Sequence, residues 1–307
     1  MKRNLLTLFD LTTEEIEQLL ERTAQLKTQK SNNDEPLQGK TLGLIFHKPS
    51  TRTRLSFEVA VSQLGGHSLF LGISDLQLDR GESIKDSARV LSRYLDGLIF
   101  RTFSHQDQEE WAQYASIPVI NALSDLFHPC QILADIFTIK EHRGHYQGAK
   151  VAYLGDGNNI AHSWLAVASK LDIRLRIASP PGYQPRPDIV TRARESAILR
   201  DDPIEIMEDP YQAVHGVDFV YTDVWTSMGQ ETEQAERRQV FYKYQLNRQL
   251  LSAAPAKACI MHCLPAHRGD EITNDVLEGE RSLVFEEAEN RLHIQKALLE
   301  WLLAEAL

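Results

Sequence analysis

Short apolar segments alternate with amphipathic helix patterns along nearly the whole chain, and this alternation restricts the possible folds more than any other feature. The segments that read as strands are Thr41–Phe46, Ser68–Leu71, Gly97–Thr102, Pro118–Ala122, Lys150–Leu154, Arg174–Ala178, Ile204–Met207, Asp218–Tyr221 and Ala258–His262. Between them, apolar residues recur every three or four positions, as at Ile160, Trp164, Val167 and Leu171. We therefore expect an α/β protein with mostly parallel sheets covered by helices on both faces.

The chain has 307 residues, and a length above about 200 residues favours more than one domain. We expect a first domain at residues 1–145 and a second at 146–287, with the boundary in the stretch Gly144–Ala149. Apolar residues at Ile294, Leu298, Trp301 and Leu302 predict a last helix at about 288–307, which we expect to pack on the first domain. Ligands of open parallel sheets bind beyond the carboxyl ends of the strands, and most polar motifs of this chain follow such ends.

Composition narrows the class of partner. The net charge of −10 argues against a general nucleic-acid or membrane-surface binder, because those need a broad basic face. No apolar run approaches the roughly 18 residues of a membrane span, and the N-terminus does not resemble a signal peptide. The three cysteines, Cys130, Cys259 and Cys263, cannot form a disulfide framework, so we expect a cytoplasmic protein.

A polar loop follows the first predicted strand and leads into a helix expected at Leu55–Leu64. Its residues are Ser50, Thr51, Arg52, Thr53 and Arg54. A helix N-terminus offers free backbone N–H groups to an anion, Ser50 suits an N-cap, and guanidinium groups match phosphate oxygens. A capped surface helix with solvated arginines is the alternative. No Gly-x-x-x-x-Gly-Lys precedes the loop, so a nucleoside triphosphate is not implied.

This loop resembles the carbamoyl-phosphate loop of the aspartate/ornithine carbamoyltransferase family, and the similarity extends over essentially the whole chain. The resemblance implies two α/β domains with the active site in the cleft between them, a homotrimer, and no metal or organic cofactor. It also implies which residues bind the phosphate of carbamoyl phosphate: Ser50, Thr51, Arg52 and Thr53.

Other positions gain a role from the same resemblance. Arg101 alone is an ordinary strand-end arginine, and His128 alone is a helix cap. In the family pattern Arg101 would bind the phosphate and also polarise the carbamoyl oxygen. His128 would contact the same oxygen, and Gln131 would bind the carbamoyl NH2. Further implied contacts to carbamoyl phosphate come from Cys263, Leu264, Arg291 and Gln77, the last reaching across to a neighbouring subunit.

The string Gly155–Asn159 follows a predicted strand and opens a helix. From the residues alone, a dinucleotide-binding loop is a reasonable hypothesis, although Ile160 replaces the third glycine of that fingerprint. The resemblance instead gives Asn159 the α-carboxylate of L-ornithine. It gives Asp223 and Ser227 the α-amino group, and it places Met228 over the side chain of the substrate.

Four potential metal ligands lie close together near the last strand: Cys259, His262, Cys263 and His267. They are interleaved in one short segment, whereas structural zinc sites usually draw pairs from separate elements, so we expect no metal. The string His262-Cys263-Leu264-Pro265 resembles the ornithine-type loop of the family. There the Leu264 carbonyl would accept from the carbamoyl amine, and Cys263 would touch the attacking nitrogen.

The implied reaction is attack of the δ-amine of ornithine on carbamoyl phosphate, giving citrulline and phosphate in arginine metabolism. Arg101, His128, Cys263 and Asp223 are the expected catalytic residues, with Cys263 in a positioning role and not a covalent one. Three alternatives stay open at this point: a carbamoyltransferase for another amine, a nucleotide-binding oxidoreductase built on Gly155–Asn159, and a non-catalytic relative.

Overall fold

The computed structural model describes residues 2–28, 35–47, 50–199, 201–226 and 231–304. The chain divides into two compact units: unit 1 contains Met1–Ala134 and Asn290–Leu307, and unit 2 contains Asp135–Glu289. Within the described residues each unit is built on a parallel sheet flanked by helices, which confirms the expected fold class.

Unit 1 holds a four-stranded sheet of order β2-β1-β3-β4. Its strands are β1 (Thr41–Phe46), β2 (His67–Gly72), β3 (Gly97–Arg101) and β4 (Val119–Leu123). Its helices are α1 (Thr13–Thr28), α2 (Thr51–Gln63), α3 (Ile84–Leu91) and α4 (His105–Tyr114), together with parts of α5 (Pro129–Arg143) and α12 (Val284–Leu303). The chain leaves unit 1 within α5 and returns to it within α12.

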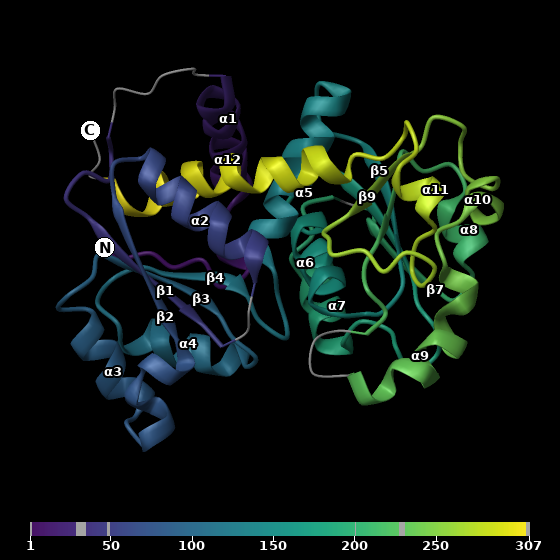
Figure 1. Ribbon diagram of the computed structural model, residues 1–307. Coiled ribbons are helices and arrows are strands. Elements are labelled where there is room, and N and C mark those ends of the chain that lie inside the picture. The colour runs from purple at the N-terminus through teal and green to yellow at the C-terminus, as the bar shows by residue number, and fades with distance from the viewer. Residues whose placement is uncertain (1, 29–34, 48–49, 200, 227–230, 305–307) are drawn as a thin grey trace. The chain divides into compact units, whose positions relative to one another are not determined.

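The strand order of unit 1 contains one reversal. From β1 the chain steps outward to β2, then crosses back over β1 to β3 and continues to β4. Because parallel crossovers are nearly always right-handed, α2 covers one face of the sheet while α3 and α4 cover the other, as Figure 1 shows. Open sheets bind ligands at such a reversal, beyond the carboxyl ends of the strands, which here are the ends of β1 and β3.

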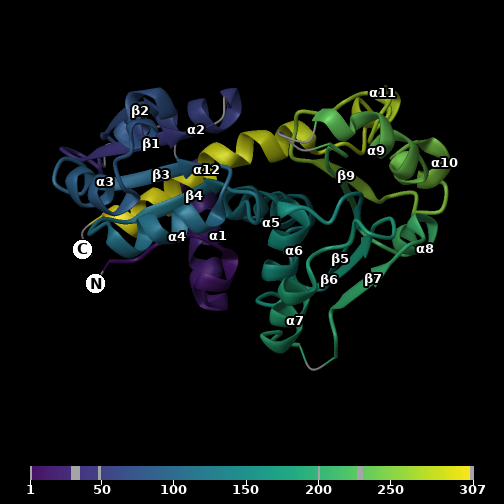
Figure 2. The same cartoon turned by 90° about the horizontal axis from the view of Figure 1, so that it is seen from below.

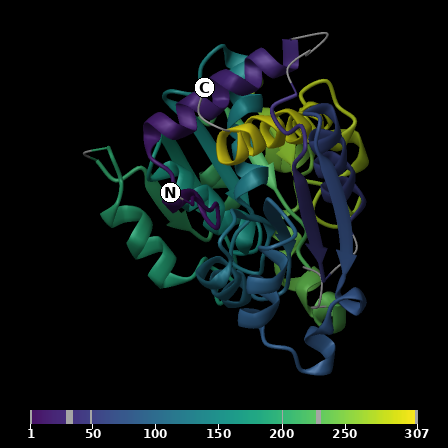
Figure 3. The ribbon, with the colours of Figure 1, turned by 90° about the vertical axis from the view of Figure 1, so that its left-hand side faces the viewer.

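Both faces of this sheet are packed. On the α3–α4 face, Phe100 contacts Trp111 with ring centroids 4.9 Å apart. On the other side, α12 lies beside α1 (Figure 3), and Arg22 donates to Glu300 over 3.0 Å. Residues from late in the chain therefore complete the unit that holds its beginning.

Unit 2 holds a five-stranded sheet of order β7-β6-β5-β8-β9. Its strands are β5 (Ala149–Leu154), β6 (Ile173–Ala178), β7 (Ile204–Met207), β8 (Phe219–Thr222) and β9 (Cys259–His262). Its own helices are α6 (Asn159–Ala168), α7 (Pro187–Glu195), α8 (Pro210–Val214), α9 (Gln234–Phe241), α10 (Arg248–Leu251) and α11 (Asn274–Leu277).

The strand order of this sheet also reverses once, between β5 and β8. The chain runs outward through β6 to β7 and then returns to β8 on the far side of β5. Helices α6 and α7 lie on one face and α8 on the other, in Figure 1 and in Figure 2. The second place where the topology favours ligand binding therefore lies beyond the carboxyl ends of β5 and β8.

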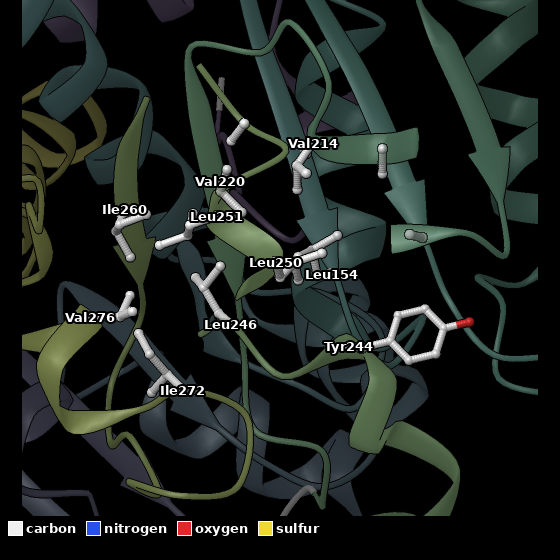
Figure 4. Close-up of a cluster of buried hydrophobic side chains, with 14 of the residues drawn as sticks. Leu154, Val214, Val220, Tyr244, Leu246, Leu250, Leu251, Ile260, Ile272 and Val276 are labelled. Atoms are coloured by element: carbon white, nitrogen blue, oxygen red, sulfur yellow. The ribbon is translucent and has the colours of Figure 1, made fainter. Parts of the chain in front are cut away.

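A cluster of buried hydrophobic side chains fills the α8–α10 face of this sheet (Figure 4). Its labelled members include Leu154, Val220 and Ile260 from three neighbouring strands, with Leu250 and Leu251 from α10. Full burial of a leucine or isoleucine side chain contributes about 1.5–3 kcal/mol. The cluster thus stabilises β5, β8 and β9, whose carboxyl ends lead into the polar residues described below.

Several helix limits differ from the sequence prediction. Helix α2 begins at Thr51 and not at Leu55, because Ser50 caps it: the Ser50 hydroxyl accepts the Thr53 N–H at 3.3 Å. Pro129 opens α5 as expected, and α12 begins at Val284, earlier than predicted. Among the described residues, no helix is both long and apolar enough to cross a membrane.

Candidate active site

In unit 1 the loop after β1 lies next to the end of β3. The two strands are hydrogen-bonded in register, with Phe46 beside Arg101. Ser50 and the first turn of α2 follow β1 directly, and Arg101 is the last residue of β3. Arg101 is buried, whereas Thr51 and Arg52 on the first helical turn are exposed to solvent.

The hydroxyl group of Thr53 lies between two buried arginines. Its Oγ1 accepts from Nη2 of Arg291 at 2.7 Å and from Nη1 of Arg101 at 3.4 Å. Thr53 is 1% exposed, Arg291 4% and Arg101 7%. Two guanidinium groups held together beside a helix N-terminus form a strongly anion-attracting site.

The same two charges act on His128. Burial and the positive charges of Arg291 and Arg101 hold the pKa of His128 well below its usual 6.5. The imidazole is therefore neutral at pH 7 and has one N–H to donate. Gln131, fully buried one turn further on, donates its backbone N–H to the carbonyl of His128 at 3.2 Å.

Arg54 and Gln77 are both exposed and have local partners. Arg54, which was not among the expected phosphate ligands, is exposed, pairs with Glu58 at 2.8 Å and stacks over the ring of Phe70. Gln77 is exposed in a short 3-10 helix, where its Oε1 accepts from Arg80 at 3.4 Å.

In unit 2 the polar residues at the strand ends gather around Asp223, which follows β8 and is buried. One carboxylate oxygen accepts from Nδ2 of Asn158 at 2.8 Å, and the other accepts from the thiol of Cys263 at 3.0 Å. Asn158 itself caps α6, because its Oδ1 accepts the backbone N–H groups of Ile160 and Ala161. The sequence analysis missed Asn158, although Asn before a strong helix pattern is a capping signal.

The glycine-rich string after β5 serves packing. A Cβ on Gly157 would lie 2.1 Å from the backbone nitrogen of Pro185, so only glycine permits this approach. The Gly157 N–H, which a dinucleotide phosphate would need, donates to the carbonyl of Tyr183 at 2.7 Å. These two contacts count against the nucleotide-binding alternative.

A buried ion pair, also missed from the sequence, joins this string to α9. Arg237 donates to Asp156 and to the carbonyl of Trp225, each at 2.9 Å. Burial raises the pKa of Asp156 to about 6, although Arg237 opposes that rise. The pair fixes the chain on either side of the segment 227–230. Ser227 and Met228 lie outside the described residues.

The turn after β9 is held by His262. Its Nδ1 accepts the Leu264 N–H at 2.8 Å, so the ring proton is on Nε2, which lies 3.0 Å from Glu271. Leu264 has a φ of 54°, and the Leu264–Pro265 peptide is cis. These contacts set Cys263 beside Asp223.

The cysteines differ in environment. Burial and the carboxylate of Asp223 raise the pKa of Cys263 well above 9, so it remains a thiol at neutral pH. Cys130 is buried and donates to the carbonyl of Asn121 at 3.5 Å, and burial raises its pKa to about 12. Cys259 lies 3.2 Å from Nε2 of His142.

Asp223, His262 and Cys263 bring potential metal-ligating atoms within 4.8 Å of one another. In this cluster both imidazole nitrogens already have partners, and the thiol donates to the carboxylate. Hydrogen bonds therefore account for the arrangement without a metal. Asn159 begins α6 on the same side of the sheet, as the first residue after the Asn158 cap.

Comparison with known proteins gives one consistent family. Residues 3–141 match the model "Aspartate/ornithine carbamoyltransferase, carbamoyl-P binding domain", and residues 147–302 match the corresponding "Asp/Orn binding domain". The chain is 53% identical to an ornithine carbamoyltransferase from Syntrophus aciditrophicus, over 99% of this chain and 100% of the relative. It is 51% identical to one from Thermococcus kodakarensis, over 97% of this chain and 95% of the relative.

Solved structures agree. The ornithine carbamoyltransferase from Pyrococcus furiosus superposes with a TM-score of 0.95 at 49% identity, covering 99% of this chain and 98% of that one. The ornithine transcarbamoylase from Giardia lamblia gives a TM-score of 0.90 at 32% identity, covering 100% of both chains.

Proposed function

We infer that this chain, which belongs to the aspartate/ornithine carbamoyltransferase family, transfers the carbamoyl group of carbamoyl phosphate to the δ-amine of L-ornithine. The products are L-citrulline and phosphate, a reaction of arginine metabolism. The observation that carries this conclusion is the buried pair of arginines bridged by Thr53 beside a neutral His128.

For carbamoyl phosphate, the proposed phosphate ligands are Ser50, Thr51, Arg52, Thr53, Arg101 and Arg291. A guanidinium of Arg101 and the neutral N–H of His128 suit the carbamoyl oxygen, since both donate hydrogen bonds. Gln131 and the Leu264 carbonyl would take the carbamoyl NH2. Charge that develops on the carbonyl oxygen would then meet preorganised donors, which is usually the largest catalytic contribution.

For ornithine, the carboxylate of Asp223 is the natural partner of the α-amino group, and Asn158 and Cys263 keep it oriented. Asn159 at the start of α6 suits the α-carboxylate, because a helix N-terminus favours anions. Ser227 and Met228 remain proposed contacts on the strength of the sequence alone.

The δ-amine must lose a proton before it attacks. With an alkyl-amine pKa near 10.4, the neutral form at pH 7 costs about 4–5 kcal/mol. Nearby guanidinium charge favours that neutral form, and the leaving phosphate can accept the proton. Cys263, held as a thiol, would position the amine and would not attack the substrate.

The proposal extends to the assembly of the chain and to its location in the cell. We propose a homotrimer in which Gln77 of one subunit reaches the phosphate bound to its neighbour; its exposure leaves it available for such a contact. We propose domain limits of 1–145 with the final helix, and 146–287. The three free cysteines fit the proposed cytoplasmic location.

The test is a colorimetric assay for the carbamoylated product with carbamoyl phosphate and each of ornithine, putrescine, N-acetylornithine and aspartate. We expect product with ornithine alone. Arg101→Gln should lower kcat by about 100-fold or more, whereas the exposed Arg93→Gln should leave it unchanged. Turnover of another amine, but not ornithine, would refute the acceptor assignment; no turnover with any amine would refute the function.

A further inference from the structure

The buried ion pair between Asp156 and Arg237 is not among the proposed substrate contacts, yet it joins two loops of unit 2 that border Asp223. Asp156 lies in the turn after β5, and Arg237 lies on α9. The side chain of Asp156 is 12% exposed and that of Arg237 is 6% exposed. Because removing two charges from water is costly, such a pair persists only where further hydrogen bonds compensate for the lost solvent.

Arg237 makes three hydrogen bonds. Its Nη1 donates to the Asp156 carboxylate and to the Trp225 carbonyl, each at 2.9 Å. Its Nε donates at 2.9 Å to Glu233, one helical turn earlier in the chain. Trp225 belongs to the loop after β8, two residues beyond Asp223. Arg237 therefore ties the turn after β5 to the loop that carries Asp223.

A second connection joins the same two loops. The carbonyl of Asp156 accepts the backbone N–H of Asn158 at 2.8 Å, and Nδ2 of Asn158 donates to the Asp223 carboxylate at 2.8 Å. Asp223 is thus held through Asn158 on one side and through its own chain to Arg237 on the other. Two cross-links between the loops restrict the position of this carboxylate more than either one alone.

Aromatic rings keep water away from the buried pair. The guanidinium carbon of Arg237 lies 5.0 Å from the ring centre of Tyr183 and 6.0 Å from that of Phe241. Phe241 in turn stacks on Trp225, with ring centroids 6.0 Å apart. Hydrogen bonds are stronger in such a region of low dielectric than in water. The Glu233 side chain, by contrast, is 51% exposed, and exposed ion pairs contribute little.

We propose that the Asp156–Arg237 pair is a positioning device that cross-links the turn after β5 to the loop after β8 and so holds Asp223 in place for the α-amino group of ornithine. The link to ornithine rests on the proposed function. The cross-link between the loops does not, so the two parts are tested by separate measurements.

The charged groups that face Asp156 give the pair a pH response. Burial raises the pKa of Asp156 to about 6, although Arg237 opposes that rise. The carboxylates of Asp223 and Glu233 add to the rise, and the Tyr153 hydroxyl on β5 faces Asp156 and donates to its carbonyl at 2.9 Å. As pH falls through about 6, Asp156 takes up a proton and the ion pair weakens. The KM for ornithine should therefore rise as pH falls below about 6.

Steady-state kinetics at neutral pH test the link to the substrate. Arg237→Gln should raise the KM for ornithine about tenfold or more and leave kcat within about threefold, because a contact to the α-amino group contributes equally to the ground state and the transition state. Affinity for carbamoyl phosphate, whose proposed phosphate ligands lie in unit 1, should stay within about twofold of wild type. The control Arg238→Gln removes only an exposed pair with Asp270 and should behave as wild type.

Two further variants separate the buried carboxylate from the exposed one. Asp156→Asn keeps an acceptor for Arg237 but removes the charge, so the KM for ornithine should rise about threefold or more and its increase below about pH 6 should disappear. Glu233→Gln should leave the KM within about twofold of wild type. Where Arg237→Gln fails to fold because Asp156 is left buried without a counter-charge, the double variant Asp156→Asn/Arg237→Gln removes both charges and should show the same rise in KM.

Two readouts do not depend on turnover. Unfolded aspartate has a pKa near 3.9, so the raised pKa of Asp156 gives stability that is complete below about pH 4 and is lost as pH rises to about 6. In that window Asp156→Asn should show a flatter pH dependence of denaturant unfolding than wild type, by up to about one proton. Backbone hydrogen exchange of residues 223–226 should be at least about threefold faster in Arg237→Gln and unchanged in Arg238→Gln.

Each part of the proposal has an outcome that overturns it. A wild-type KM for ornithine in both Arg237→Gln and Asp156→Asn would overturn the positioning role. Equal exchange rates in wild type and Arg237→Gln would overturn the cross-link, and a KM as high in Glu233→Gln as in Asp156→Asn would overturn the assignment to the buried pair. If the wild type transfers no carbamoyl group, the proposed function fails together with the link to ornithine, while exchange and unfolding still decide the cross-link.

Discussion

Replacing Thr53 by valine removes one hydroxyl from between two arginines while nearly preserving the shape of the side chain. The Thr53 oxygen accepts from Arg291 at 2.7 Å and from Arg101 at 3.4 Å. Since the oxygen is occupied as an acceptor, the hydroxyl hydrogen is free to donate to a third group. In the proposed site that group is a phosphate oxygen.

The expected loss follows from the charges involved. A hydrogen bond to a charged group contributes about 1.5–3 kcal/mol, which corresponds to a roughly 10- to 150-fold weaker Kd for carbamoyl phosphate or inorganic phosphate. The two guanidinium groups would also lose their shared acceptor. At saturating phosphate, a twentyfold weaker Kd would reduce ligand-induced stabilisation by about 1.8 kcal/mol.

Calorimetric titration with phosphate, together with unfolding at several phosphate concentrations, measures both quantities. Thr23→Val is the matched control, because Thr23 is also a buried helical threonine, but its hydroxyl donates to the Leu19 carbonyl at 2.6 Å. The control should bind phosphate normally. Unchanged phosphate affinity in Thr53→Val would refute the assignment of this hydroxyl to the anion site.

Three further predictions follow from the same structure. The depressed pKa of His128 should keep its imidazole neutral from pH 6 to 8. Because the unfolded histidine takes up a proton near pH 6.5, this site lowers the free energy of unfolding below that pH. An NMR titration midpoint near 6.5 for the His128 ring would contradict the prediction. Cys263→Ser should keep measurable turnover, and complete loss with intact substrate binding would argue for a covalent role. Gly157→Ala should lower the free energy of unfolding by about 2–3 kcal/mol, because its Cβ would clash with Pro185. In the control Gly182→Ala the Cβ meets open space, and the free energy of unfolding should fall by about 1 kcal/mol. Equal decreases in the two variants, measured by denaturant unfolding, would count against the clash.

The strands could be predicted closely because each is a short apolar run between polar turns. The predicted limits of Thr41–Phe46 and Ile204–Met207 match β1 and β7. Helix α2 was harder to delimit, since its first turn consists of the polar residues expected of a loop. The start of α2 is identified by the capping hydrogen bond that the Thr53 N–H donates to the Ser50 hydroxyl.

The missed residues share a physical cause. Asn158 meets Asp223 from 65 residues away, and Arg237 meets Asp156 from 81 residues away. No local periodicity reports such pairs, because each residue type is ordinary for its own turn or helix. They become visible only when neighbouring parallel strands bring their carboxyl ends together.

The discontinuous make-up of unit 1 has a consequence for synthesis. Thr53 and Arg101 emerge early from the ribosome, but Arg291 emerges only after every strand of unit 2 has been made. Unit 2 is continuous and can complete its sheet first, as domains generally fold as units. The anion site, whose first residues are translated before any of unit 2, is therefore among the last parts of the nascent chain to assemble.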